Sequence, residues 1–157
     1  MLRTVLKVDI GAGNKREEGW TTLDRVAASN PDIVADLEEV LPLEDNSVDA
    51  MRAFHVLEHI NNLLPLMNEC HRVITPFGYL QIKVPIWPSV DTIVDPTHVR
   101  QFAMGTFHYW EEGHYLHEEY GKLYGMETWK MLQQPSRASN GRNMEALVVL
   151  QPVKSNA

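Results

Sequence analysis

The sequence predicts an α/β fold with a doubly wound, mostly parallel sheet and an antiparallel hairpin at its C-terminal end. Short apolar runs alternate with polar or helical segments through the first half of the chain, a pattern typical of parallel α/β sheets. The C-terminal part has two β-like runs with a hydrophilic, turn-forming spacer between them, which favours antiparallel pairing at a sheet edge. The chain has 157 residues, so we expect a single domain over residues 1–157.

The elements of the first half follow in chain order. Five β-like runs are the predicted strands of the parallel part: residues 4–10, 20–24, 32–36, 48–54 and 78–84. The clearest helix covers residues 62–75, where asparagines offer an N-cap and the segment from Pro76 to Gly78 is expected to end the helix.

The second half is less regular. Residues 85–95 predict a long irregular loop, and loops of this length in compact domains are often functional. Residues 107–124 predict one or two short helices that break near Gly113 and Gly121. The two β-like runs of the tail are residues 126–133 and 144–153, and their spacer is residues 135–143.

The composition argues against two classes of partner. A net charge of −7 and a pI near 5.4 repel polyphosphates, and no cluster of five or more Lys and Arg residues offsets this, so we expect no nucleic-acid partner. No apolar run approaches the roughly 18 residues of a membrane span, so we expect no membrane partner. Cys70 is the only cysteine, and the N-terminus has no signal-like segment, which together predict a cytoplasmic protein.

The segment VDIGAG at residues 8–13 is the most informative feature of the chain. An apolar strand that ends in two glycines one residue apart lets the backbone turn tightly and admits a ligand where a side chain would collide. Asp24 closes the next strand-like run, and a carboxylate there can accept hydrogen bonds from both hydroxyls of a ribose. We therefore expect a nucleoside-type cofactor. Arg16 stands where a dinucleotide fingerprint has its third glycine, which counts against NAD.

Six motifs occur in the order found in class I S-adenosylmethionine-dependent methyltransferases. They are VDIGAG at residues 8–13, Asp24, ADL at 35–37, LPLEDNSVD at 41–49, FHVLEH at 54–59 and RVITPFGYL at 72–80. The chain resembles small bacterial-type members of this family with a shortened first crossover, and the resemblance covers about residues 4–84. It implies a Rossmann-like fold, methyltransferase activity and S-adenosylmethionine as the cofactor.

The resemblance also implies which residues hold that cofactor. Asp9 and the backbone of Gly11, Ala12 and Gly13 correspond to the group that holds the methionine end. Asp24 corresponds to the ribose ligand, and Asp36 with the Leu37 amide to the ligands of the adenine edge. The cofactor should lie across the carboxyl ends of the first and fourth strands, at the topological switch point. The short segment between Gly13 and Asp24 leaves open how the methionine carboxylate is covered.

Two histidines are the candidate catalytic residues. His55 follows the fourth predicted strand, from which this fold usually reaches the reacting centre, and we expect it to line the cofactor site as well. His98 lies in the loop that should cover this centre. An imidazole can take the proton that a hydroxyl or amine acceptor loses. The alternative is that His55 only caps the strand and His98 only caps a helix.

The segment His55-x-x-Glu58-His59 also has the pattern of an inverted zinc metallopeptidase. On a helix, the two histidines would share one face and could chelate a metal. The pattern directly follows a predicted strand, however, so we favour a strand exit and expect no metal. His114 and His117 lie beside Glu118 and Glu119, and we interpret them as a solvated helix face.

The sequence thus predicts an S-adenosylmethionine-dependent methyltransferase that acts on an unidentified, small-molecule acceptor. Two alternatives remain: a catalytically silent cofactor-binding module that serves interactions, and the zinc metallopeptidase. A cavity with convergent polar groups over residues 85–102 would favour an enzyme, and a flat surface a module. The sequence does not indicate the oligomeric state.

Overall fold

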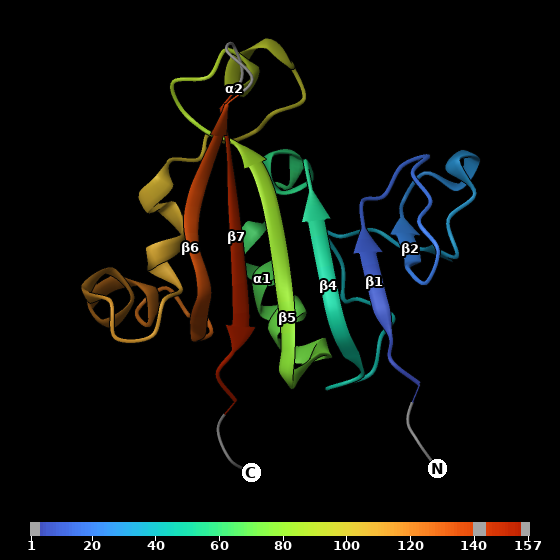
Figure 1. Cartoon of the computed structure of the whole chain (residues 1–157), viewed down its shortest axis with the longest axis horizontal. Coiled ribbons are helices and arrows are strands. Elements are labelled where there is room, and N and C mark those ends of the chain that lie inside the picture. The colour runs from blue at the N-terminus through green and yellow to red at the C-terminus, as the bar shows by residue number, and fades with distance from the viewer. Residues whose placement is uncertain (1–3, 140–143, 155–157) are drawn as a thin grey trace.

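The computed structural model describes residues 4–139 and 144–154. Seven strands form one sheet in the order β3-β2-β1-β4-β5-β7-β6 (Figure 1). They are β1 (Lys7–Ile10), β2 (Thr21–Asp24), β3 (Ile33–Val34), β4 (Val48–Phe54), β5 (Ile74–Pro85), β6 (Trp129–Ser139) and β7 (Met144–Pro152). Strands β1 to β5 pair in parallel, whereas β7 pairs antiparallel with both β5 and β6. The predicted α/β fold, with its mostly parallel sheet and antiparallel C-terminal strands, is confirmed.

The helical segments are short. They are η1 (Ala27–Ser29), η2 (Leu57–His59), α1 (Leu63–Val73), α2 (Asp91–Val94), η3 (Met104–Tyr109) and η4 (His117–Gly121). Figure 1 shows α1 lying against one face of the sheet, behind β5 and β7 in this view. Its apolar stripe of Leu63, Leu66, Met67, Cys70 and Val73 is buried there, as the helical spacing of these residues requires.

Strand β4 has the predicted bounds, but β1 and β3 are shorter than predicted. Ahead of β1, the Leu6 amide donates to the Asp49 carboxylate at 2.8 Å instead of joining the ladder. Strand β3 has only two residues, and it begins one residue later than predicted, where Asp32 turns its carboxylate to Thr22. That carboxylate accepts hydrogen bonds from the Thr22 amide at 2.7 Å and from its hydroxyl at 2.8 Å.

The helix predicted over residues 62–75 is found as α1, with two corrections. The asparagine side chains do not cap it; the Glu38 carboxylate instead accepts from the amides of Asn61 and Asn62, at 2.6 and 3.0 Å. The helix also ends earlier than the predicted stop at residues 76–78. Ile74 has extended backbone and pairs with Val48, so β5 begins directly after the helix.

The second half needs further corrections. The loop predicted over residues 85–95 contains the short helix α2 and is therefore not irregular throughout. Strand β6 continues to Ser139, so residues 135–139 of the predicted spacer are strand; residues 140–143 lie outside the described residues. The pairing of this edge strand shifts register twice between Met131 and Ser136. These irregularities accommodate Pro135, which cannot donate a hydrogen bond to a neighbouring strand.

The core lies between α1 and the sheet. Cys70 is fully buried on α1, and burial raises the pKa of its thiol to about 12, as suits a packing residue. Trp129 is also fully buried, and the His71 ring meets it edge-on, with ring centroids 5.2 Å apart. Within the described parts of the chain, no helix has the length and apolar character to cross a membrane.

His71 is a buried titratable group in this core. Its Nε2 lies 3.1 Å from the Val153 carbonyl oxygen, a contact in which the ring donates. Burial lowers the pKa of His71 below its ordinary value, and the nearby Lys154 charge acts in the same direction.

We predict that His71 makes the fold acid-sensitive. Because its pKa is lower in the folded than in the unfolded state, the unfolded chain takes up this proton first, and stability falls as the pH drops below about 6.5. Urea unfolding at pH 7.5 and 5.5 should therefore show a smaller acid-induced loss of stability in His71→Gln than in the parent chain. Equal losses in both chains would show that His71 does not contribute.

Candidate cofactor and acceptor site

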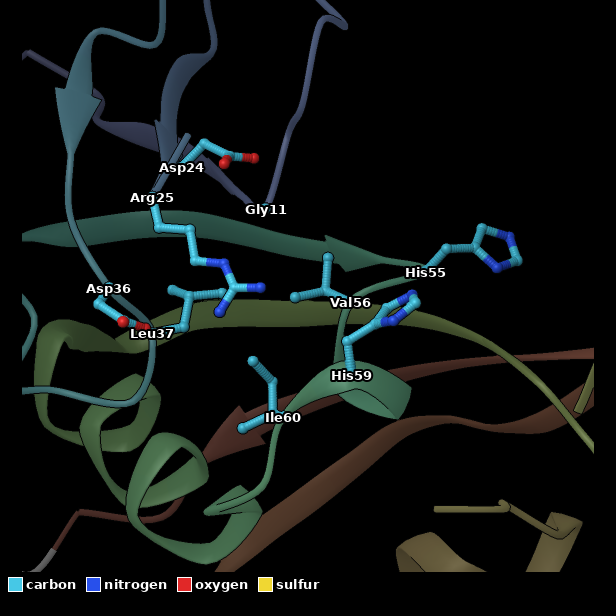
Figure 2. Close-up of a pocket in the computed structure, with 9 residues that line it drawn as sticks. All are labelled: Gly11, Asp24, Arg25, Asp36, Leu37, His55, Val56, His59 and Ile60. Atoms are coloured by element: carbon cyan, nitrogen blue, oxygen red, sulfur yellow. The ribbon is translucent and has the colours of Figure 1, made fainter. Parts of the chain in front are cut away.

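A cavity of about 140 Å³ lies where β1, β2, β3 and β4 end. It is lined by Gly11, Asp24, Arg25, Asp36, Leu37, His55, Val56, His59 and Ile60. Figure 2 shows the two acids on one side of the lining and the two histidines on the other, with the Arg25 side chain reaching in between Leu37 and Val56. The sheet order reverses direction at β1 and β4, so this is the topological switch point where open α/β sheets bind ligands.

The glycine turn after β1 brings the backbone to this cavity. Gly11 and Gly13 have φ values of +64° and +55°, a left-handed conformation that glycine adopts without steric cost. A Cβ on Gly11 would lie 2.5 Å from Cγ2 of Val56, whereas a Cβ on Gly13 would meet nothing within 4 Å. Gly11 is thus required both by its conformation and by the close approach of Val56, which follows β4.

Asp24 fixes the turn from the neighbouring strand. One oxygen of its buried carboxylate accepts a hydrogen bond from the Gly13 amide at 2.8 Å, and the other from the Val26 amide at 2.8 Å. Each carboxylate oxygen has a second lone pair, so Asp24 can still accept hydrogen bonds from a ligand. The residue predicted as the ribose ligand therefore also shapes the loop that holds the rest of the site.

The cavity brings together five of the predicted cofactor residues: Gly11, Asp24, Asp36, Leu37 and His55. The other three, Asp9, Ala12 and Gly13, do not line it. Asp9 is buried, and its carboxylate lies 2.7 Å from the Arg52 guanidinium in an ion pair. Ala12 is buried beside the turn, and Gly13 lies in the turn itself, where its amide donates to Asp24.

Sequence reasoning missed four lining residues: Arg25, Val56, His59 and Ile60. Three of them follow His55 within one short segment. They could have been predicted if the chain had been expected to turn back directly after the strand, as it does at η2. Arg25 directly follows the predicted ribose ligand, so its proximity could also have been inferred. Its side-chain direction depends on the loop conformation and has no sequence signal.

The connection from β1 to β2, residues 11–20, contains no helix. Arg16 holds its position by donating to the carbonyls of Gly13 and Lys15, at 3.1 and 2.7 Å. The same guanidinium donates to the carbonyls of Ser29 and Asn30 beyond β2, at 2.6 and 2.5 Å. The shortened first crossover is therefore tied to the next connection by one arginine.

A second cavity, of about 300 Å³, shares His55 and His59 with the first. Its remaining lining residues are Glu58, Pro85, Asp91, Val94, Asp95 and His98. Three carboxylates and three histidines thus converge here, which is the hollow, polar arrangement that the sequence analysis connected with an enzyme rather than an interaction module. Both predicted catalytic residues, His55 and His98, line it.

His55 lies at the junction of the two cavities. It follows β4 with a φ of +57°, and its Nδ1 lies 3.4 Å from Oε1 of Glu58. Its Nε2 lies 3.0 Å from Oε1 of Glu145 on β7. The hydrogen bond to Glu58 raises the pKa of His55 above its ordinary value, against the opposite effect of burial. A non-glycine residue in this backbone conformation indicates a locally strained strand exit.

The structure does not place His55-x-x-Glu58-His59 on one helix. His55 follows the end of β4, and only Glu58 and His59 belong to the single turn η2. The helical face that a metallopeptidase motif needs is absent from this segment. The interpretation of His114 and His117 also needs a correction, because His117 is fully buried and bonded to the Tyr109 carbonyl at 2.8 Å and the Thr128 hydroxyl at 2.9 Å.

An α/β sheet with a glycine turn and an acidic strand end around a cavity at the switch point defines a nucleoside-binding Rossmann-like protein. A family described as "Methyltransferase domain" matches residues 3–82, half of the chain. The chain belongs to this methyltransferase domain family, and the predicted family is confirmed.

Similar proteins agree with this membership. A protein named "Probable S-adenosylmethionine-dependent methyltransferase" from Mycolicibacterium smegmatis is 37% identical over 65 residues. That match covers 39% of this chain and 25% of the relative, so the chain spans about a quarter of the curated relative's length.

Solved structures share the fold at low identity. A 1,6-didemethyltoxoflavin-N1-methyltransferase from Burkholderia thailandensis has a TM-score of 0.64 at 14% identity, covering 97% of this chain and 72% of that one. A 16S rRNA (adenine(1408)-N(1))-methyltransferase from Catenulisporales acidiphilia has a TM-score of 0.65 at 10% identity, covering 98% and 87%. At these identities the likeness establishes the fold, and the fold serves both kinds of acceptor.

We predict that substitution by alanine destabilises the protein more at Gly11 than at Gly13. Gly13→Ala should cost about 1–2 kcal/mol of stability, because only the left-handed conformation is penalised. Gly11→Ala should cost more, since its Cβ also collides with Val56. The double variant Gly11→Ala/Val56→Ala should recover part of that excess. Denaturant unfolding measures all three, and equal losses for the two single variants would contradict the collision.

Proposed function

We propose that this chain is an S-adenosylmethionine-dependent methyltransferase with a small-molecule acceptor. The observation that carries the proposal is the pair of cavities that share His55 and His59, one along the ends of β1 to β4 and one beside it with converging polar groups. The first has the features of a nucleoside site, and the second can hold an acceptor next to it. The name of the mycobacterial relative supports the same cofactor.

The residues present fit this cofactor. Asp24 aims a buried carboxylate at the cavity for the ribose hydroxyls, while Asp36 and the Leu37 amide can bind the adenine edge. Leu37, Val56 and Ile60 supply apolar walls for the ring, on which the Arg25 guanidinium can stack. The backbone from Gly11 to Gly13, with Ala12 between the two glycines, is the segment proposed to hold the methionine end. Asp9 does not line the cavity, and its carboxylate is paired with Arg52.

S-adenosylmethionine supplies a sulfonium-bound methyl group, and its transfer leaves the bonding pair on sulfur as S-adenosylhomocysteine. The acceptor's lone pair forms the new bond, and its proton must go to a base. His55 and His98 line the acceptor cavity and are the groups proposed to take this proton. Glu58 can orient His55 through the 3.4 Å contact, and Asp95 lies 3.9 Å from Nε2 of His98.

The choice of a small molecule over a nucleic acid rests on charge. The chain has a formal net charge of −7, and the acceptor cavity is lined by Glu58, Asp91 and Asp95 without a lysine or arginine among its lining residues. Polyphosphates would be repelled from such a site. The cytoplasmic location stays a prediction.

We predict that the purified chain binds S-adenosylhomocysteine and that Asp24→Ala weakens this binding. The loss should be about 1.5–3 kcal/mol, the range for hydrogen bonds to a charged group. Calorimetry measures the affinity, with Glu39→Ala as a control that removes an exposed carboxylate outside the cavity. Because Asp24 also holds the turn, unfolding curves and Asp24→Asn accompany the measurement. A parent chain that binds neither S-adenosylhomocysteine nor S-adenosylmethionine would refute the proposed function.

The acceptor can be found by supplying methyl-labelled cofactor to metabolite and protein extracts. With that acceptor, His55→Ala and His98→Ala should each lower turnover by about a hundred- to ten-thousand-fold, the usual share of a general base. Their cofactor affinity should stay within about threefold, under 1 kcal/mol. Full turnover in both variants would remove them from catalysis, and a loss of cofactor affinity alone in His55→Ala would make it a cofactor ligand.

A further inference from the structure

We propose that Glu58, His59 and His98 form a binding site for a divalent transition-metal cation in the acceptor cavity. From the sequence we expected no metal, because the His55-x-x-Glu58-His59 pattern directly follows a predicted strand. The fold replaces His55 with His98, from a loop distant in sequence, and so assembles a different set of ligands. One ligand atom from each of the three side chains lies within 4.8 Å of the other two.

The backbone holds these three residues together. Glu58 and His59 are neighbours on η2, and the Glu58 carbonyl accepts a hydrogen bond from the Val99 amide at 2.9 Å. Arg100 donates to the carbonyls of Ile60 and Asn61, both at 2.7 Å. The loop is therefore held directly after His98, at Val99 and Arg100, by bonds that a ligand would not disturb.

Two of the three ligands have buried polar atoms without a partner. Glu58 is only 1% exposed, and its Oε2 makes no hydrogen bond, although Oε1 approaches His55. The His98 side chain is 9% exposed, and its Nδ1 is likewise unpartnered. A buried carboxylate oxygen and a buried imidazole nitrogen that face no partner cost free energy, and a cation between them would remove that cost.

The third ligand is held in the tautomer that a metal requires. The Thr97 hydroxyl donates its one hydrogen to Asp95 Oδ1 at 2.6 Å, so toward Nδ1 of His59, 2.9 Å away, it can only accept. His59 therefore carries its hydrogen on Nδ1 and presents the lone pair of Nε2. Hydrogen bonding of this kind to the second ring nitrogen is what orients metal-binding histidines.

A second cluster with similar composition lacks these properties. His108, Glu111 and His114 also lie within 4.8 Å of one another. There, however, Glu111 already binds His108 at 2.5 Å and Gln134 at 2.8 Å, and His114 accepts from the Leu116 amide at 3.2 Å. Both Glu111 oxygens and Nδ1 of each histidine are thus bonded within the protein, and no atom of this cluster is among the buried unpartnered ones of the described residues, so this cluster serves as the control.

The donor set selects the class of cation. Two imidazoles and one carboxylate suit Zn²⁺ and its neighbours in the transition series, whereas Mg²⁺ and Ca²⁺ prefer all-oxygen sites. Bonds of about 2.1 Å would draw the ligand atoms to about 3.4 Å from one another in a tetrahedral site, a modest closure from the observed cluster. Three protein ligands leave the fourth position open to the cavity, as in catalytic zinc sites.

If the proposed function holds, this cation defines the class of acceptor. A metal-bound hydroxyl has a lowered pKa and loses its proton to water, which leaves an oxygen nucleophile next to the methyl donor's cavity. The acceptor is then a small molecule with a metal-binding hydroxyl group. With the cation bound, His98 serves as a ligand in place of the proton-accepting role proposed above, and the loss of turnover expected for His98→Ala then comes from loss of the metal.

The test is titration of Zn²⁺ into the untagged, chelator-treated full chain by calorimetry, with Mg²⁺ as the comparison. We expect one Zn²⁺ per chain and no measurable heat with Mg²⁺. His98→Gln, His59→Gln and Glu58→Gln should each weaken Zn²⁺ binding at least a hundredfold, and Thr97→Val about 10- to 100-fold through the orientation of His59. His114→Gln should leave the affinity unchanged. Circular dichroism checks folding, and His98→Gln decides the outcome if the buried Glu58 variant does not fold.

The same samples separate the two proposals. Absence of Zn²⁺ binding, binding that survives His98→Gln, or binding lost in His114→Gln would each overturn the metal site. S-adenosylhomocysteine binding by the parent chain and by His98→Gln would then still support the proposed function. Zn²⁺ binding that depends on His98, in a chain that binds neither form of the cofactor, would establish the metal site and refute the methyltransferase proposal.

Discussion

The structure depends on Arg52, because the connection from β1 to β2 has no helix to hold it against the sheet. Its guanidinium lies 2.7 Å from the Asp9 carboxylate on β1 and 2.5 Å from that of Glu17 in the connection. It also lies over the Trp20 ring, 4.3 Å from its centroid. The buried Arg52 guanidinium thus contacts β1 through Asp9, and the connection through Glu17 and Trp20, the residue before β2. Removal of Arg52 would leave the Asp9 charge buried without a partner, which is among the most destabilising changes a core can suffer.

Other arginines act in the same way elsewhere in the chain. Arg72 joins α1 to the preceding loop, with bonds to the Glu69 carboxylate at 2.7 Å and the carbonyls of Leu41 and Leu43 at 3.1 and 3.0 Å. Arg100 joins the loop of His98 to the segment after η2. A guanidinium has five donors in a planar fork, so one side chain can fix two segments where a helix would need many residues. Connections without a helix can therefore still hold the residues of the site in fixed positions.

The fold and the glycine turn at the cofactor cavity could be predicted from the sequence. The alternation of apolar runs identified β4 to the residue, and the glycines and Asp24 marked the turn that forms the cavity. The first residues of β3 and α1 were less predictable because Asp32 and Glu38, which bond there, connect to other segments of the chain. Local propensity cannot anticipate such tertiary hydrogen bonds.

The candidate metal cluster shows the same limit. The sequence motif around Glu58 already contains two of the three residues of this cluster, Glu58 and His59. Helical periodicity alone, however, would have added His55 as the third residue instead of His98. The approach of His98 is set by the bonds of Val99 and Arg100 to the residues of η2 and its exit, which no spacing rule describes. The π-helical segment η4 likewise buries His117, which the sequence suggested would lie on a solvated helix face.

Because of its position, the Cys70 thiol can report when helix α1 separates from the sheet. It is the only thiol in the chain, it is fully buried between α1 and the sheet, and it lies outside both cavities. A thiol reagent can therefore react only when the helix separates from the sheet, and the rate of labelling in native buffer measures how often that happens. Ligands that tighten the strand ends should slow this labelling only as far as they stabilise the whole sheet. The native sequence thus allows local closure of the cavities to be distinguished from global stabilisation without an engineered probe.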